Sequence, residues 1–478
     1  MKPEQTCMLP NSPSKGKASA PSSAQGPGSG SAWPPFPAGK PPLLRPESGL
    51  ALRPGDRAVV VGAGVSGGAA ACLLAAAGLR VRLVDRREEN ISAELRTLAE
   101  AAGIEILWGE HCPEQFADAV LAVASPGVPG SVLAPLLKNA PGGPAGGLPL
   151  VGEMELALAF TADPVLAVTG SSGKTTTASL AAAMLRETGK TVFLGGNIGT
   201  PLSRYVLEGG GADVLVLELS SFQLQGCRSL RPRAGILLNL TPNHLDRHAD
   251  MAEYAEAKFS LFARQTAEDL AVLPPVLAEE YRRRGFMGRL EIFEDQGRFP
   301  RSRLLGRHNA ANAEAAYLAA RVFGVSAAEA GRAVAGFAPL RHRLEWVGSR
   351  KGVSYINDAK CTTVDSLRAA LSSFDVPVVL LAGGRFKGGD LSALSPLLRQ
   401  RVKEVILFGA CREIFEAAWA GAVPLSWRES LEPAFAEARG RAGSGDVVLL
   451  SPAAASYDLY ANYQERGDHF CRLVRELE

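Results

Sequence analysis

Short runs of consecutive apolar residues, separated by glycine-rich turns and helical patterns, recur along this chain. The first example is residues 57–86, RAVVVGAGVSGGAAACLLAAAGLRVRLVDR. It contains an apolar run, a glycine cluster, a helical stretch rich in alanine and leucine, and a second apolar run that ends at Asp85. This order is typical of a βαβ unit and predicts a Rossmann-like first domain.

A second α/β pattern begins at Pro164. The segment PVLAVTG leads into a glycine turn and then into a helix that we expect to begin near Lys174. Two further runs, 213–219 and 234–240, are apolar nearly throughout and do not alternate with polar residues. Such strands are buried on both faces of a parallel sheet, so we predict a P-loop ATPase-like central domain.

A third unit follows Pro339. Its apolar runs, which alternate with helical stretches, are residues 353–358, 376–384, 402–409 and 446–452. They predict a second Rossmann-like domain at the C-terminal end. Because 478 residues are too many for one hydrophobic core, we predict an α/β protein of three successive domains. The expected ranges are 49–162, 163–338 and 339–478, after a tail at 1–48.

The tail at 1–48 differs in composition from the rest, because it is rich in Pro, Gly, Ser and Ala. Such a segment cannot bury enough apolar surface to offset its ordering entropy, so we expect it to be disordered. A transit peptide is the alternative, since acidic residues are sparse and serines plentiful, although arginine is scarce and no amphipathic helix is evident.

Bulk composition excludes several classes of partner. The net charge is +2, with 46% apolar and 21% charged residues, so neither nucleic acid nor a membrane is an expected partner. No apolar run approaches the roughly 20 residues of a membrane span, and the N-terminus lacks a secretory signal. The seven cysteines show no metal-binding or redox spacing. We expect reduced thiols in a cytoplasmic protein.

The first candidate site is GAGVSG at 62–67, followed by Asp85. It fits the dinucleotide fingerprint, with Gly62 for the turn, Gly64 for close phosphate approach and Gly67 for helix–strand packing. Alone, it is compatible with an NAD or FAD oxidoreductase. A helix N-terminus binds any diphosphate, however, so a UDP-sugar is an equal candidate.

The second and more specific motif is GSSGKTTT at 170–177, between a predicted strand and a predicted helix. Its backbone N–H groups can bind phosphates, Lys174 can reach the β- and γ-phosphates, and Thr175 or Thr176 can ligate Mg²⁺. The motif departs from the full P-loop pattern, because Val168 replaces the first glycine. The alternative is a glycine–threonine turn with a surface lysine.

Two polar residues follow the central apolar runs. Glu218 ends the run 213–219, where a carboxylate beside a P-loop can hold Mg²⁺, unless it simply faces solvent. His244 follows the next run, and at the same sheet edge we expect it to bind metal or substrate rather than to be structural.

Further polar residues suit a nucleotide. Asn309 and Asn312 share one helix face and fit a purine or ribose edge, although helix capping is the alternative. Arg343, Asp358 and Lys360 come next along the chain. An ATP site must offset roughly four negative charges, and arginine and lysine do so with different geometry.

Two segments near the C-terminus follow predicted strands in the same way. Lys387 lies in GGRFKGGD, and Ser451 and Ser456 lie in LSPAAASYDLY. Open α/β sheets bind ligands at the carboxyl ends of their strands, so one edge for each of three ligands is expected.

These motifs together resemble the Mur ligase family of ATP-dependent amide ligases. GSSGKTT, ELSSFQL, the Asn-His-Leu-Asp-Arg segment and the His-Asn-x-x-Asn helix occur in the family's order, and the resemblance covers roughly residues 55–478. INDAKCTT, AGGRFKGGD and LSPAAASYDLYANYQERGDHF are similar to segments of the members that add D-glutamate.

The resemblance implies a reaction and its cofactors. ATP would phosphorylate the carboxylate of UDP-N-acetylmuramoyl-L-alanine, and the amine of D-glutamate would attack the acyl phosphate, in cytoplasmic peptidoglycan precursor synthesis by a monomer. Such chemistry needs positioning and charge neutralisation more than a covalent nucleophile. The implied cofactors are ATP, two Mg²⁺ ions and a carbamylated Lys258, in EYAEAKFSLF, that helps to bind the second metal. The three domains would bind the UDP substrate, ATP and the amino acid in that order.

The resemblance also implies a role for each matching residue. The catalytic group is Lys174, Glu218, His244, Lys258 and Lys360. The ATP group is Gly170, Ser171, Ser172, Gly173, Lys174, Thr175, Thr176, Asn309, Asn312, Arg343, Asp358 and Lys360. The UDP-substrate group is Val65, Ser66, Asp85, Arg86, Gly127, Asn197 and His244, and the D-glutamate group is Thr362, Lys387, Ser456 and Tyr463. The metal group is Thr175, Glu218, His244 and, if carbamylated, Lys258.

Five positions depart from the family pattern. Asn243 replaces the usual aspartate, Ser172 an asparagine, Leu344 a phenylalanine, Thr363 an asparagine and Tyr463 a phenylalanine. The change at residue 243 leaves the histidine that follows without a neighbouring carboxylate to orient it.

Three alternatives stay open at this point. A folylpolyglutamate-type ligase would lack the GxGxxG unit before the P-loop, which this chain has. A non-catalytic nucleotide-binding module is disfavoured by the presence of Lys174, Glu218, Lys258 and Lys360. The oxidoreductase rests on GAGVSG alone.

Overall fold

The structure is a computed structural model that describes residues 42–142, 144, 147–242 and 247–477. Most of the tail that we predict to be disordered therefore lies outside the described residues. Its last part is described and contains a short 3₁₀ helix, Pro46–Ser48. The side chain of Arg45 donates a hydrogen bond of 2.7 Å to the carbonyl of Thr161, which ties this part to the first domain.

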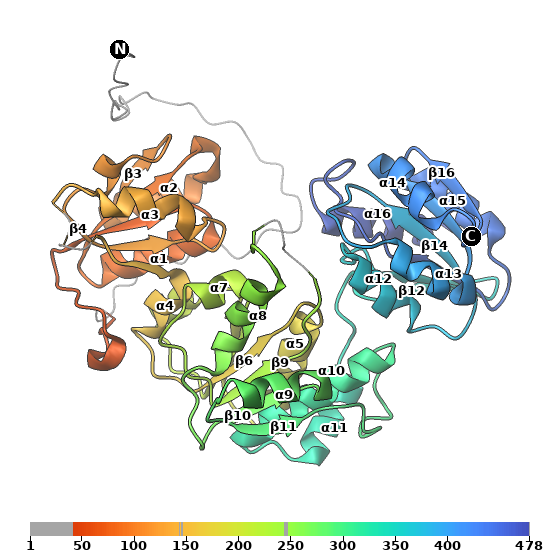
Figure 1. Ribbon diagram of the computed structural model, residues 1–478, viewed down its shortest axis with the longest axis horizontal. Helices are drawn as coiled ribbons and strands as arrows, with labels where there is room; N and C mark the ends of the chain where they lie inside the picture. Colours follow the sequence, from red (N-terminus) through yellow and green to blue (C-terminus); the bar gives the residue numbers. More distant parts are fainter. Residues whose placement is uncertain (1–41, 143, 145–146, 243–246, 478) are drawn as a thin grey trace, which may run out of the picture. The chain divides into compact units, whose positions relative to one another are not determined.

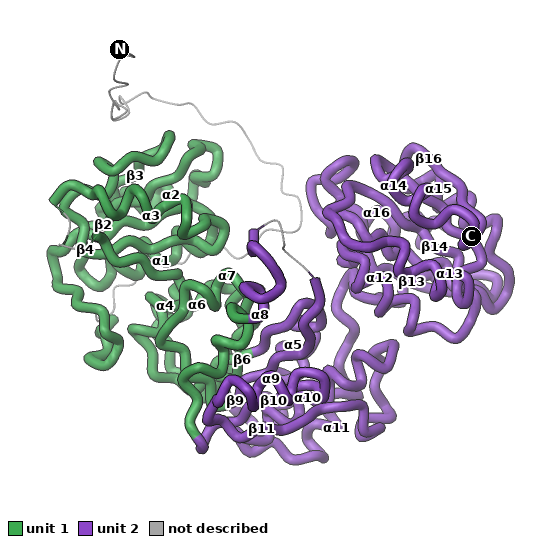
Figure 2. Tube along the Cα trace, viewed as in Figure 1, with its two compact units in different colours: residues 1–167, 191–233, 256–266 green, residues 168–190, 234–255, 267–478 purple. Residues whose placement is uncertain are grey.

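The described residues form three β-sheets with intervening helices (Figure 1). The predicted α/β fold of three successive domains is confirmed. The chain also divides into two compact units (Figure 2): residues 1–167, 191–233 and 256–266 in one, and residues 168–190, 234–255 and 267–478 in the other. Each sheet lies within one expected domain range, whereas the boundaries of those ranges stay a prediction.

The N-terminal sheet is entirely parallel, in the order β3-β2-β1-β4-β5. Its strands are β1 (Arg57–Val61), β2 (Arg80–Asp85), β3 (Glu105–Trp108), β4 (Ala119–Ala124) and β5 (Leu150–Gly152). Its helices are α1 (Val65–Ala76), α2 (Ala93–Ala102), α3 (Gly130–Lys138) and α4 (Glu153–Leu158). The strand order reverses between β1 and β4, which is where open α/β sheets place a ligand crevice.

The glycines after β1 act locally as the sequence predicts. Gly62 has a φ of +98°, a left-handed conformation that glycine adopts without strain. A Cβ on Gly67 would lie 1.8 Å from the carbonyl oxygen of Gly62, so α1 approaches the strand as closely as only glycine allows. A Cβ on Gly64 would meet nothing within 4 Å. That Gly64 allows a phosphate to approach closely therefore stays a prediction.

The central sheet has the order β11-β10-β9-β6-β8-β7. Its strands are β6 (Val165–Thr169), β7 (Val192–Gly196), β8 (Val214–Glu218), β9 (Ala234–Leu237), β10 (Leu270–Leu273) and β11 (Arg289–Ile292). Its helices are α5 (Lys174–Arg186), α6 (Leu202–Leu207), α7 (Ser221–Gln225), α8 (Met251–Phe259), α9 (Pro275–Arg283), α10 (Arg307–Ala320) and α11 (Ala327–Gly336). The predicted helix start at Lys174 is confirmed, and β6 and β8 are buried at every position.

Helices α5 and α10 pack against each other, and both bury small side chains. Their fully buried residues include Ala178, Ala181 and Ala182 on α5, and Ala313 and Ala316 on α10. A Cβ on Gly173, directly before α5, would lie 3.0 Å from the side chain of Asn312, so the start of α5 lies close to α10.

The C-terminal sheet has the order β12-β13-β17-β14-β15-β16, with β12 antiparallel to β13. Its strands are β12 (Glu345–Arg350), β13 (Val353–Asn357), β14 (Val378–Gly383), β15 (Val402–Phe408), β16 (Leu425–Arg428) and β17 (Val447–Leu450). Its helices are α12 (Val364–Leu371), α13 (Ser395–Arg401), α14 (Arg412–Trp419), α15 (Leu431–Arg441) and α16 (Tyr463–Arg475).

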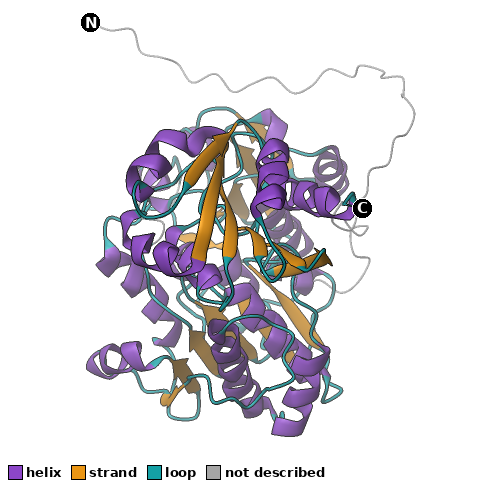
Figure 3. Cartoon of the chain, turned by 90° about the vertical axis from the view of Figure 1, so that its right-hand side faces the viewer, coloured by secondary structure: helices purple, strands orange, loops and turns teal. Residues whose placement is uncertain are grey.

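Helices cover this sheet on both sides (Figure 3). Successive residues of β14 alternate between two cores: Leu380 packs in the cluster that contains Trp419, and Leu381 in the cluster that contains Phe470. Since both faces are buried, the strands are continuous apolar runs, as the sequence indicates. Because β13 and β14 both run parallel to β17, the carboxyl ends of these three strands meet at one edge of the sheet.

Candidate active site

The glycine loop between β6 and α5 folds around the side chain of Lys174. Gly173 precedes the helix with a φ of +81°, and Gly170 has a φ of +152°, so both need the freedom of glycine. The Lys174 ammonium donates hydrogen bonds to the carbonyls of Gly170, at 2.8 Å, and Ser171, at 3.2 Å. A phosphate approaching this loop thus meets a lysine that is already close to the loop backbone.

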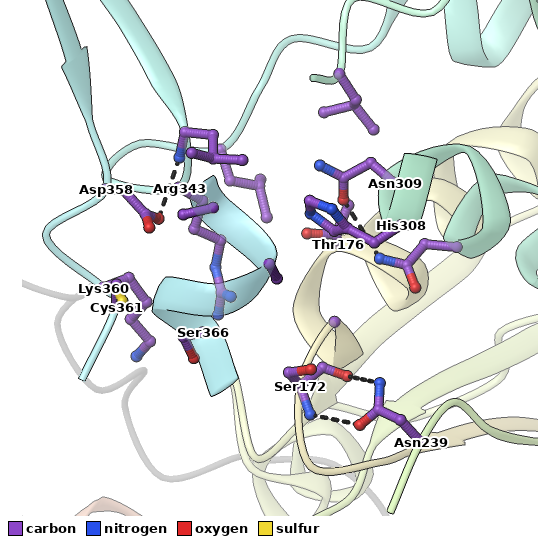
Figure 4. Close-up of a pocket in the computed structure, with 17 residues that line it drawn as sticks. Ser172, Thr176, Asn239, His308, Asn309, Arg343, Asp358, Lys360, Cys361 and Ser366 are labelled. Carbon is purple, nitrogen blue, oxygen red and sulfur yellow. Dashed lines mark hydrogen bonds between the residues drawn. The ribbon is translucent and has the colours of Figure 1, made fainter. Parts of the chain in front are cut away.

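Residues after β9 fasten the glycine loop. The backbone N–H of Ser172 donates to Asn239 Oδ1 at 2.9 Å, and Asn239 Nδ2 donates to the carbonyl of Ser172 at 3.2 Å (Figure 4). Ser171 Oγ donates to the carbonyl of Thr241 at 2.9 Å. Sequence reasoning missed Asn239, although an asparagine at the end of an apolar run is a usable signal.

The segment after Pro339 reaches the same helix. Arg343 Nη2 donates to Thr175 Oγ1 at 2.7 Å. Its neighbours His342 and Leu344 have φ values of +64° and +44°, a left-handed conformation that is unfavourable for residues other than glycine. The backbone is therefore held in a strained turn at the point where the arginine enters the phosphate loop.

Asp358 is a buried carboxyl group next to this turn. It accepts hydrogen bonds from the N–H of Leu344, at 3.2 Å, and from Ser451 Oγ, at 2.8 Å. Burial raises the pKa of Asp358 to about 7, although the hydrogen bonds and the nearby guanidinium groups lower it in part. The group therefore titrates near neutral pH.

These elements enclose a cavity of about 130 Å³ (Figure 4). The residues of the predicted ATP group that line it are Ser172, Gly173, Thr176, Asn309, Asn312, Arg343, Asp358 and Lys360. The other members, Gly170, Ser171, Lys174 and Thr175, are not among the lining residues. Asn309 and Asn312 share one face of α10, as the sequence indicates, and Asn312 Nδ2 donates to Asn309 Oδ1 at 3.3 Å, whereas their contact with a nucleotide stays a prediction. His308 also lines the cavity, and burial lowers its pKa, so it is neutral at pH 7.

A much larger cavity, of about 910 Å³, lies at the carboxyl edge of the N-terminal sheet. All described residues of the predicted UDP-substrate group line it: Val65, Ser66, Asp85, Arg86, Gly127 and Asn197. His244, the remaining member, lies outside the described residues. Asn90, His111 and Ser125 also line the cavity and carry no sequence motif that would have identified them.

Asp85 organises the rim of this large cavity. Its Oδ2 accepts the N–H of Ala63 at 2.7 Å, and its Oδ1 accepts the N–H of Arg87 at 3.0 Å and Asn90 Nδ2 at 2.7 Å. Burial alone would raise the pKa of Asp85, but these hydrogen bonds outweigh it and lower the pKa. The ionised carboxylate holds the glycine loop in place.

Glu218, at the end of β8, is buried with an exposed fraction of 2%, so it does not face solvent. Its Oε1 accepts Asn197 Nδ2 at 2.8 Å, whereas its Oε2 has no hydrogen-bond partner among the described residues. A buried carboxylate oxygen without a donor fits a metal ligand. Lys258 on α8 is also buried, at 1% exposed.

The described residues do not by themselves complete a metal site. They contain no cluster of three His, Cys, Asp or Glu side chains that could hold an ion. His244, a predicted ligand, lies in the undescribed segment 243–246.

The predicted D-glutamate group lies on the C-terminal domain. Thr362, Lys387 and Ser456 follow β13, β14 and β17, and Tyr463 begins α16. The Lys360 ammonium lies 3.9 Å from the centroid of the Tyr463 ring, a cation–π distance. The two cavities described above do not gather these residues.

The structure gives a local account of four of the five departures from the family pattern. Ser172 is held through its backbone. Leu344 is buried in the strained turn. Thr363 caps α12 by accepting the N–H of Ser366, and Tyr463 places its ring over a lysine. Asn243 lies outside the described residues.

Comparison with known proteins agrees with this architecture. Three family models match: the MurD-like N-terminal domain of Mur ligases at residues 56–141, the Mur ligase middle domain at 168–286, and the glutamate ligase domain of Mur ligases at 342–454. A UDP-N-acetylmuramoylalanine--D-glutamate ligase from Nitratidesulfovibrio vulgaris is 56% identical over 89% of this chain and 98% of its own length. A ligase of the same name from Lawsonia intracellularis is 47% identical over 88% and 94%. The chain therefore belongs to the Mur ligase family.

Solved structures show the same fold at low identity. A MurF ligase from Thermotoga maritima, solved in complex with ADP, has a TM-score of 0.56 and 17% identity over 83% of this chain and 96% of its own. Family membership decides against the oxidoreductase alternative. No helix in the part of the chain that the structure describes is long and apolar enough to cross a lipid bilayer.

Proposed function

We propose that this chain ligates D-glutamate to UDP-N-acetylmuramoyl-L-alanine, with ATP as phosphoryl donor, in cytoplasmic peptidoglycan precursor synthesis. The observation that carries the proposal is 56% identity over 98% of the length of a relative with that name. We also propose that the protein is a monomer.

The UDP substrate binds in the 910 Å³ cavity at the carboxyl edge of the N-terminal sheet. The free N–H groups at the start of α1, around Val65 and Ser66, receive its diphosphate, because a helix N-terminus favours negative charge. Gly127 and Asn197 also line this cavity. Asp85 acts indirectly, since its carboxylate fixes the loop that presents those N–H groups.

ATP binds at the glycine loop and α10. The loop N–H groups and Lys174 contact its phosphates, and Asn309 and Asn312 face its nucleoside. Arg343 exchanges its hydrogen bond with Thr175 for the phosphates, which releases that hydroxyl for Mg²⁺. The residues proposed to hold Mg²⁺ are Thr175, Glu218, His244 and carbamylated Lys258.

The chain supplies positioning and charge for the two chemical steps. The substrate carboxylate attacks the γ-phosphorus of ATP, ADP leaves, and an acyl phosphate forms. The D-glutamate amine then attacks the acyl carbon, and phosphate leaves as the amide forms. Lys174 and Lys360 neutralise the transferred phosphoryl group, and Thr362, Lys387, Ser456 and Tyr463 hold D-glutamate. Bound Mg²⁺ would neutralise phosphate charge.

The direct test is phosphate release with UDP-N-acetylmuramoyl-L-alanine, ATP and Mg²⁺. D-Glutamate should support turnover, whereas L-glutamate, L-alanine, lysine and diaminopimelate should not. Turnover with another amino acid alone would keep the family and overturn the substrate assignment. No turnover with any of them would contradict an intact catalyst.

The carbamate on Lys258 has a separate test. Lys258→Ala should lose activity by about 100-fold, because the second metal loses an anionic ligand, and added short carboxylates should restore part of it. Full activity without added carboxylate would overturn this assignment. Melting of the variant near that of the parent protein would show that the buried lysine is not simply structural.

A further inference from the structure

Arg466 is a buried cation that none of the roles above uses. It lies in the first turn of α16, three residues after Tyr463, and it is fully buried. Its guanidinium group donates to three backbone carbonyls: Gly383 at 3.2 Å, Ala359 at 3.0 Å and Ala454 at 2.9 Å. One planar group thus joins three separate stretches of backbone.

Each of the three carbonyls belongs to a different strand of the C-terminal sheet or to the loop that follows it. Gly383 ends β14, Ala359 follows β13, and Ala454 follows β17. These strands are neighbours in the order β13-β17-β14. Arg466 therefore lies under the carboxyl edge at which the chain leaves all three strands.

Burial of the guanidinium group at this position costs free energy. No acidic side chain of the described residues forms an ion pair with Arg466, and its Nε has no hydrogen-bond partner there. Burial lowers the pKa of Arg466 to about 10, so the group still carries its charge at neutral pH. The carboxyl groups of Asp358 and Asp458 raise its pKa in part but form no ion pair with it, and such a buried charge destabilises a fold relative to an apolar side chain of similar size. Its use here calls for a reason other than stability.

The three loops carry the residues assigned to the amino acid and to ATP. Lys360 follows Ala359 directly, Ser456 lies two residues after Ala454, and Lys387 lies four residues after Gly383. A shift of any of these carbonyls would displace the polar side chain that follows it.

The loops after β14 and β17 are also joined directly. The N–H of Arg385 donates to the carbonyl of Ala455 at 2.8 Å, and the N–H of Ala455 donates to the carbonyl of Arg385 at 2.9 Å. A Cβ on Gly384 would lie 2.2 Å from the oxygen of Ala455 and 3.0 Å from Arg466 Nη1. The loops and the guanidinium group are therefore packed without spare room.

We propose that Arg466 is a positioning residue for the ligation reaction: by holding the carbonyls of Ala359, Gly383 and Ala454, it fixes Lys360, Lys387 and Ser456 relative to one another. The proposal rests on the proposed function of the chain. It assigns the arginine no contact with substrate, so its effect must pass through the three loops.

The informative variant is Arg466→Lys, because lysine keeps the charge but cannot reach three carbonyls with one planar fork. The KM for D-glutamate should rise by about ten- to a hundredfold and kcat should fall, since small displacements of positioned groups have effects of this size. The KM for UDP-N-acetylmuramoyl-L-alanine should not change. Arg472→Lys, an exposed arginine on the same helix, is the matched control and should behave as the parent protein.

If Arg466→Lys folds poorly, a second variant and a double-mutant cycle test the same proposal. Arg466→Gln, which is neutral and retains two donors, should show the same split between the two KM values. We also combine either Arg466 variant with Lys387→Ala. The loss of kcat/KM in the double variant, expressed as a free energy, should be smaller than the sum of the losses in the two single variants, because both changes act through one loop.

The outcomes separate the two proposals. If the parent protein turns over D-glutamate and a folded Arg466 variant keeps its KM for D-glutamate, the positioning role is overturned, whatever the melting temperature does. If the parent protein does not use D-glutamate at all, the proposed function fails before Arg466 is tested.

Discussion

The cavity at the edge of the N-terminal sheet and the cavity beside the phosphate loop differ in size and in the use of their polar groups. The N-terminal cavity measures about 910 Å³, and the cavity beside the phosphate loop about 130 Å³. In the first, the hydrogen bonds of Asp85 fix the wall and leave the space open. In the second, Lys174 and Arg343 reach back to the loop and to Thr175.

This difference separates a preformed site from a site whose groups must exchange partners. At its proposed site, the UDP substrate would enter a cavity whose wall is already fixed. At its proposed site, ATP would replace hydrogen bonds between the protein's own groups, so part of its binding energy would be used for that exchange. We therefore expect changes at the phosphate loop to affect ATP strongly and the UDP substrate little.

The largest expected effect comes from Lys174→Ala. Loss of this ammonium should lower ATP-dependent phosphate release by about a thousandfold or more, because its proposed role is to neutralise the transferred phosphoryl group. Binding of the UDP substrate, measured by calorimetry, should be unchanged, and Lys138→Ala, an exposed lysine on α3, should be neutral. Equal losses for both ligands would break the distinction between the cavities.

A smaller effect is expected for Asn239→Ala, which removes both bonds to the backbone of Ser172. The KM for ATP should rise about tenfold, in line with about 1 kcal/mol for a lost hydrogen bond and a looser loop. Asn239→Asp keeps the acceptor for the Ser172 N–H but turns an anionic oxygen toward the carbonyl of Ser172 and toward the phosphate site, so its KM for ATP should rise at least as far as that of the alanine variant. An unchanged KM for ATP in both variants would show that the loop needs no fastening.

The smallest effect concerns pH. The pKa of Asp358 is about 7 in the folded protein and lies near 3.8 in the unfolded chain, so the folded state binds more protons between these values. The contribution of Asp358 to the free energy of unfolding is then fully present below the lower pKa. It falls as the pH rises through the higher pKa, by at most about 1.4 kcal/mol per pH unit. Scanning calorimetry from pH 5 to 8 should show this decline, a few degrees in melting temperature, and Asp358→Asn should flatten it. A parallel pH profile in the variant would contradict the assignment.

Sequence reasoning found the fold because most central strands are buried on both faces. The runs around β6, β8, β14 and β17 do not alternate between apolar and polar residues, so they cannot be mistaken for surface segments. Strand β12 was missed, since EWVGSR lies at an edge of the sheet and buries only Gly348. Strand β16, four residues long and half-buried, gave too short a signal.

The candidate site was predictable where its chemistry is local in sequence. Lys174 and the glycines around it stand in one motif, and the two asparagines of α10 stand one turn apart. Arg466 could not be identified in this way, because it owes its place to backbone carbonyls far away in the chain, such as that of Ala359.

The packing of α5 against α10 bears on how freely this protein can vary. Ala181 on α5 and Ala316 on α10 are fully buried, so a larger side chain at either position would overpack its surroundings and displace its helix. Such a movement would shift the phosphate loop relative to Asn309 and Asn312. Resistance mutations selected by a nucleotide-competitive inhibitor should therefore avoid this seam and arise at the cavity's apolar rim, at residues such as Leu304 or Leu340.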